Sequence, residues 1–84
     1  MMKKKTSVEE DVGRICDTLE AAVVRAMVGG MRTREIAHAC EVSEASVYNW
    51  RRSKDLDLSR FFRLALAIGA DPWQLLAKAA PKKR

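Results

Sequence analysis

The sequence has few of the residues that support metal binding, redox chemistry or catalysis. It contains one histidine, His38, and two cysteines, Cys16 and Cys40, with no CxxC pair among them. Zinc sites need about four such ligands at close spacing. Gly29-Gly30 lacks the spacing and the lysine of a phosphate-binding loop. We therefore expect no cofactor, no metal and no enzymatic activity, and we expect both cysteines to be small buried apolar residues with reduced thiols.

Long apolar runs are also missing. No uncharged apolar segment approaches the ~20 residues of a membrane span. The first residues are basic, but Glu9, Glu10 and Asp11 stand where the apolar segment of a signal peptide would begin. The sequence therefore predicts a cytoplasmic protein with no membrane partner.

What is present fits one small globular domain. The chain has 84 residues, of which 48% are hydrophobic and 32% charged, with a net charge of +5. Residues 1–30 carry five charges of each sign, so the whole excess lies in residues 31–84. An uneven basic excess favours a polyanionic partner on one part of the surface, although it is weak evidence alone.

Apolar residues recur every three or four positions along the chain, which predicts an all-α fold of five helices and no strand. The expected helices span residues 8–28, 33–40, 44–52, 60–68 and 72–80. Ser7 with Glu10 is a capping box, Ser43 and Ser59 are expected N-caps, and Asp71-Pro72 is a strong start signal. Residues 7–80 are expected to form the domain, flanked by a basic disordered head (1–6) and a basic tail (81–84).

The same spacing predicts which side chains form the core. Trp50 and Trp73 are expected to anchor it. The other predicted core residues are Val8, Val12, Ile15, Cys16, Leu19, Val23, Ala26, Met27, Ile36, Ala37, Cys40, Val42, Val47, Phe62, Leu64, Ala65, Leu66, Ile68, Leu75 and Leu76. The opposite face of the first helix is acidic, with Glu9, Glu10, Asp11, Asp17 and Glu20.

Two short helices separated by very few residues are typical of a helix-turn-helix. The segment Met31–Trp50, MRTREIAHACEVSEASVYNW, resembles the helix-turn-helix of phage repressor and Cro-type regulators, the XRE group. Leu64–Leu76 is similar to the fourth and fifth helices of that family. The family usually has glycine at the turn, because the turn needs a positive φ. This chain has Glu41 at that position. The resemblance implies a compact repressor-like domain whose third helix enters the major groove of duplex DNA.

With Val47 and Trp50 facing inward, the helical step places Ala45, Tyr48, Asn49 and Arg52 on the outer side of the third helix. The predicted base-contacting residues are Ser43, Glu44, Ala45, Tyr48 and Asn49. The predicted phosphate-contacting residues are Arg32, Thr33, Ser46, Arg51, Arg52 and Lys54.

One recognition helix specifies only a few base pairs. We therefore expect a transcriptional regulator, most simply a repressor, that acts as a homodimer or larger assembly on half-sites about one turn (~34 Å) apart. Either the first helix or the C-terminal side could form the interface. Two alternatives remain open, a DNA-binding antitoxin whose acidic first helix holds a basic toxin and a helix-turn-helix that only binds proteins.

Overall fold

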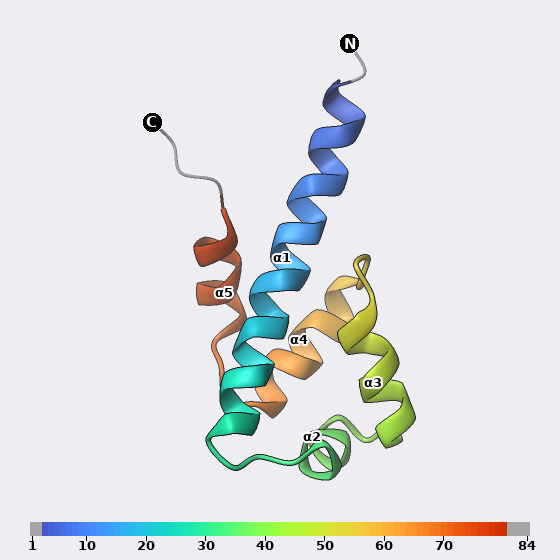
Figure 1. Cartoon of the computed structure of the whole chain (residues 1–84), viewed down its shortest axis with the longest axis vertical. Helices are drawn as coiled ribbons and strands as arrows, with labels where there is room; N and C mark the ends of the chain where they lie inside the picture. The colour runs from blue at the N-terminus through green and yellow to red at the C-terminus, as the bar shows by residue number, and fades with distance from the viewer. Residues whose placement is uncertain (1–2, 81–84) are drawn as a thin grey trace.

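The computed structural model describes residues 3–80 of the chain, and side chains from residue 8 onward. Within that range it contains five helices and no strand, which confirms the all-α prediction. The helices are α1 (Lys3–Val28), α2 (Thr33–Cys40), α3 (Glu44–Arg52), α4 (Leu58–Ala67) and α5 (Pro72–Ala79). Figure 1 shows the four short helices gathered around the C-terminal half of α1. The predicted tail, 81–84, lies outside the described residues.

The first helix begins earlier than the sequence predicts. It starts at Lys3 and runs for 26 residues, so Ser7 lies inside the helix and the predicted capping box with Glu10 is wrong. Residues 3–6 of the predicted disordered head are part of this helix. Lysine is a good helix former, and neither glycine nor proline interrupts residues 3–12. No helix in residues 3–80 is long and apolar enough to cross a bilayer.

The core lies where α1, α2, α3 and α4 meet. Its largest fully buried side chains are Val23, Ile36, Val47 and Leu64, one from each of these helices. The fifth helix closes the core with Leu75, which is 7% exposed. Both cysteines are buried and unpaired, as the sequence predicts.

Three residues that were predicted to be in the core lie on the surface instead. Val8, Leu66 and Trp73 are 61%, 64% and 69% exposed. Trp73 follows Pro72, which faces inward, and the helical step of 100° turns the indole outward, where it meets the edge of the Phe62 ring. In α4 the buried row instead includes Phe61, which the sequence analysis missed.

The last two helices begin at aspartate caps. Asp57, rather than the predicted Ser59, caps α4 by accepting a hydrogen bond from the Arg60 amide at 2.8 Å. Asp71 caps α5 as predicted and accepts from the Trp73 amide at 2.9 Å. Aspartate competes well with serine for this position because its carboxylate also interacts favourably with the positive end of the helix dipole.

Candidate functional site

The segment that carries most of the predicted site consists of α2, α3 and the three residues between them. Ile36, Ala37 and Cys40 bury one side of α2. Val47 is the single fully buried residue of α3, and Trp50 packs half-buried against the core. Because so little of α3 is buried, most of its surface faces outward.

The bend between these helices depends on Glu41. Its backbone is left-handed, with φ 60° and ψ 43°. The Val42 amide donates to the Ala37 carbonyl at 3.0 Å and the Glu41 amide to the His38 carbonyl at 3.1 Å. The same pattern ends α1 and α4, but there the left-handed residue is Gly30 or Gly69. A glutamate thus adopts the conformation that glycine would adopt at lower cost.

The third helix starts at a serine cap, Ser43, whose hydroxyl makes two hydrogen bonds. The oxygen accepts from the Ser46 amide, and the hydroxyl lies 3.1 Å from the Ser46 hydroxyl, to which it donates. The cap is therefore confirmed. Ser43 is exposed and keeps a second acceptor lone pair, so its base contact stays a prediction.

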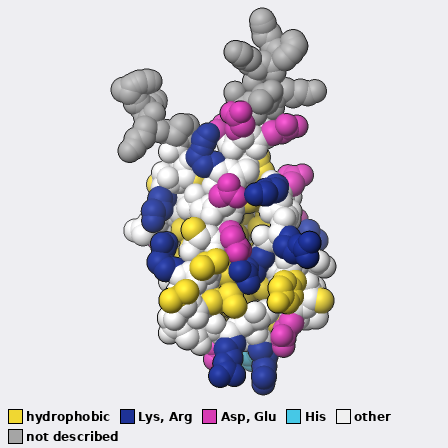
Figure 2. Space-filling view, viewed as in Figure 1, with side chains coloured by type: hydrophobic (Ala, Val, Ile, Leu, Met, Phe, Trp, Pro, Cys, Tyr) yellow, Lys and Arg dark blue, Asp and Glu magenta, His cyan; other side chains and the backbone are white. Residues whose placement is uncertain are grey.

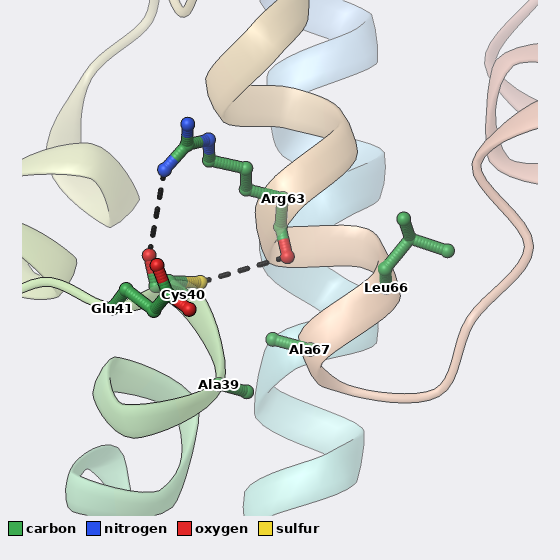
Figure 3. Close-up of a pocket in the computed structure, with 6 residues that line it drawn as sticks. All are labelled: Ala39, Cys40, Glu41, Arg63, Leu66 and Ala67. Carbon is green, nitrogen blue, oxygen red and sulfur yellow. Dashed lines mark hydrogen bonds between the residues drawn. The ribbon is translucent and has the colours of Figure 1, made fainter.

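The end of α2 is also fastened to α4. Arg63 Nη1 donates to the Cys40 carbonyl at 3.4 Å, and Cys40 Sγ donates to the Arg63 carbonyl at 3.5 Å, as Figure 3 shows. Burial raises the pKa of the Cys40 thiol, and the charge of Arg63 lowers it only in part. The thiol therefore stays protonated at neutral pH and serves as a structural donor at the edge of an open hollow of about 320 Å³.

The outer face of α3 presents five of the predicted DNA contacts to solvent. Its exposed residues are Glu44, Ala45, Tyr48, Asn49 and Arg52. Next to it, at the start of α2, the side chain of Arg32 is exposed and Thr33 is half-buried. Figure 2 shows Lys and Arg side chains at the α2 end of the molecule and Asp and Glu side chains on the part of α1 at the opposite end.

The predicted phosphate contact of Arg51 requires a correction, because the Arg51 guanidinium is hydrogen-bonded within the protein. Its Nε and Nη2 donate to the two oxygens of Glu20 at 3.0 and 2.6 Å, and its Nη1 donates to the Met27 sulfur at 3.3 Å. The Arg51 side chain is only 19% exposed. The hydrogen bond to Glu20 raises the pKa of Arg51, and burial offsets part of this effect. Arg51 therefore joins α3 to α1 and does not project toward a phosphate.

The remaining predicted phosphate contacts are Ser46 and Lys54. Ser46 is half-buried and bonded to the cap, whereas Lys54 is exposed and lies 3.3 Å from Asp17. Exposed pairs of this kind contribute about 0–1 kcal/mol, so Lys54 can exchange Asp17 for another anion at little cost.

Sequence reasoning missed two groups at this site. Glu20 was assigned only to an acidic surface, and nothing in the chain signals a partner in α3, far away in sequence. Arg60 places its guanidinium 5.7 Å from the centre of the Trp50 ring. Its position in the first turn of α4, directly after the loop that follows α3, is the signal that could have identified it.

No group of His, Cys, Asp or Glu that could hold a metal ion occurs among residues 8–80. Comparison with protein-family models, with curated proteins and with solved structures found no match to this chain. The likeness to Cro-type regulators therefore remains a prediction from the residues of Met31–Trp50.

Proposed function

We propose that α2, the Glu41–Ser43 turn and α3 are a helix-turn-helix that binds duplex DNA sequence-specifically, as in a transcriptional repressor. The observation that carries the proposal is the outer face of α3, whose residues Glu44, Ala45, Tyr48, Asn49 and Arg52 are exposed while Val47 and Trp50 hold the opposite side of the helix against the core. A short helix attached by one edge is able to enter the major groove, which is about 12 Å wide.

Four residues of this face have side chains suited to base edges. Asn49 can pair with adenine through two hydrogen bonds, Glu44 can accept from a cytosine amine, and Ala45 can contact a thymine methyl group. Tyr48, 58% exposed, adds an aromatic ring and a hydroxyl. Glu44 repels phosphate, so it favours a selective binder over a general one. Ser43, also a predicted base contact, can still accept one hydrogen bond beyond those of the cap.

Phosphate contacts come from both sides of this face. At the start of α2, the helix leaves the first amides, those of Thr33 and Arg34, without intrahelical partners, and the exposed Arg32 side chain lies beside them. Arg52 and Lys54 supply charge after α3. These groups would position the protein on the duplex, while the outer face of α3 selects the sequence.

The acidic side of α1 is less suited to holding a basic protein, as an antitoxin would. Glu20 is committed to Arg51, and Asp17 lies against Lys54. Only the acidic residues nearer the start of the helix remain away from such cross-helix pairs. The α1 surface therefore gives little support to a basic protein partner, whereas DNA binding is common to both interpretations.

Titration of the isotopically labelled protein with a mixed-sequence duplex, followed by amide chemical shifts, tests the proposed face. We expect the largest changes at Thr33–Ile36 and Glu44–Asn49. Changes concentrated on α1 or α5, or none at all, would contradict the proposal.

A matched pair of variants controls for general charge attraction. Arg32→Gln and Arg25→Gln remove the same charge from two exposed positions, one beside α2 and one on α1. We expect Arg32→Gln to weaken DNA binding several-fold and to reduce the salt slope by about one unit. Arg25→Gln should do neither.

A further inference from the structure

Three cations, Arg51, Arg52 and Lys54, lie within four residues where α3 ends. Acidic side chains of α1 pair with two of them. Arg51 contacts Glu20, and Lys54 contacts Asp17. Arg52 is exposed and has no ion-pair partner in the part of the chain that the structure describes. The acidic residues of α1 therefore decide how much of this positive charge is free to bind phosphate.

The two pairs differ in how readily they open. The Arg51 side chain is 19% exposed and donates to both oxygens of Glu20, so this pair is a fixed part of the fold. The side chains of Lys54 and Asp17 are 75% and 67% exposed, and they share a single contact of 3.3 Å. Exposed contacts of this kind are weak and are screened by salt. Lys54 can therefore leave Asp17 when another anion approaches.

The contact between Lys54 and Asp17 follows from the position of α3. Lys54 comes three residues after Arg51, and Asp17 comes three residues before Glu20. Residues three apart on a helix are neighbours on its surface, so the two acidic side chains lie about one turn apart along α1. Because the Arg51–Glu20 pair fixes the end of α3 beside α1, the chain that follows brings Lys54 to Asp17.

We propose that Asp17 competes with DNA phosphate for Lys54 and thereby lowers the affinity of the protein for duplex DNA of any sequence. The inference rests on the proposed function, in which Lys54 contacts a phosphate beside α3. Lys54 has to give up its carboxylate partner to make that contact, and the Asp17 charge repels the approaching phosphate. Phosphates carry no sequence information, so the effect is the same for every duplex.

This competition alters the salt dependence of binding. A lysine that moves from solvent to a DNA phosphate releases about one cation from the DNA. When Lys54 moves from Asp17 instead, the carboxylate that is left behind attracts a cation, which offsets the release. Removing the Asp17 charge therefore restores the release, and the slope of log K against log salt becomes steeper.

Fluorescence anisotropy of the full chain with two duplexes of unrelated sequence, over a range of salt concentrations, tests the proposal. We expect Asp17→Asn to bind both duplexes about two- to fivefold more tightly than the wild type, the range that an exposed ion pair accounts for. The salt slope should become steeper by up to about one unit. Circular dichroism confirms that the variant stays folded.

Glu10→Gln is the matched control. Glu10 is an exposed carboxylate on nearly the same side of α1 as Asp17, about 10 Å further along the helix. Charges at that separation are largely screened at physiological salt, where the Debye length is about 8 Å. We expect Glu10→Gln to bind DNA as the wild type does. An affinity of Asp17→Asn no higher than that of Glu10→Gln would overturn the proposal.

A double variant tests whether Asp17 acts through Lys54. With Lys54→Gln in place there is no ammonium group to compete for, so adding Asp17→Asn should change neither the affinity nor the salt slope. Tightening of the same size in this background would show that Asp17 only repels DNA, and would overturn the competition for Lys54.

The wild type separates this proposal from the proposed function. If the wild type binds duplex DNA and Asp17→Asn cannot be distinguished from Glu10→Gln, the role of Asp17 is overturned and the proposed function stands. Absence of duplex binding by the wild type would overturn both.

Discussion

At the scale of single residues, Glu41 has the most unusual backbone of the chain. It is the one residue other than glycine with a positive φ in the part of the chain that the structure describes. The backbone hydrogen bonds around Glu41 match those around Gly69. The two turns therefore differ mainly in whether the left-handed residue carries a side chain. The left-handed conformation costs a residue with a Cβ atom about 1–2 kcal/mol.

Glu41→Gly should therefore stabilise the protein by about 0.5–1 kcal/mol, after allowance for the greater flexibility of glycine in the unfolded chain. Thermal unfolding measures this as a rise in Tm of several degrees. Gly69→Ala is the matched control, since a Cβ there meets nothing within 4 Å and only the backbone conformation changes. It should lower Tm. Destabilisation by Glu41→Gly would show that the glutamate side chain makes a compensating interaction.

The residue-level predictions from sequence succeeded where local rules are sufficient. Ser43 and Asp71 cap helices because a short polar side chain directly before a helix can accept a hydrogen bond from a free amide of the first turn. The predicted core position of Trp73 was wrong because a hydrophobic side chain was assumed to be buried, whereas large aromatic residues also lie on surfaces. The Arg51–Glu20 pair could not be predicted, because it depends on how α3 packs beside α1.

At the scale of the elements, α3 is positioned by two different devices. The glutamate turn and Val47 hold its N-terminal half against α2 and the core, and the Arg51–Glu20 pair holds its C-terminal end against α1. Adjacent arginines thus have distinct roles. Arg51 orients the helix, while the exposed Arg52 is available to DNA.

The salt dependence of DNA affinity distinguishes these roles. Arg52→Gln should weaken binding and reduce the slope of log K against log salt by about one unit, as the loss of one phosphate contact does. Arg51→Gln should weaken binding with the slope unchanged and should also destabilise the fold by about 1 kcal/mol, since the pair is only partly screened. Glu20→Gln should resemble Arg51→Gln. An equal loss of slope in both arginine variants would contradict the assignment.

The helices themselves were largely predictable, and their ends less so. Apolar spacing located all five, because a thin core leaves each helix one buried stripe. The start of α1 was missed because the stripe ends at Val8, beyond which periodicity gives no signal. The cap of α4 was misplaced because Asp57 and Ser59 are both acceptable caps, and only packing of Phe61 decides between them.

At the scale of the whole molecule, the two ends of α1 have different surroundings. One end carries the compact group of short helices with the exposed outer face of α3, and the other extends beyond that group, with Val8 61% exposed. We propose sequence recognition for the first end only.

Selection of bound duplexes from a randomised library at near-physiological salt tests sequence-specific recognition by α3. For the wild type we expect an enriched motif of two similar halves about one turn apart. In a parallel selection Asn49→Ala should lose preference at one base position in each half, at a cost of roughly 1–3 kcal/mol. No enrichment, with binding that disappears as salt rises, would leave only charge attraction and would contradict sequence-specific recognition by α3.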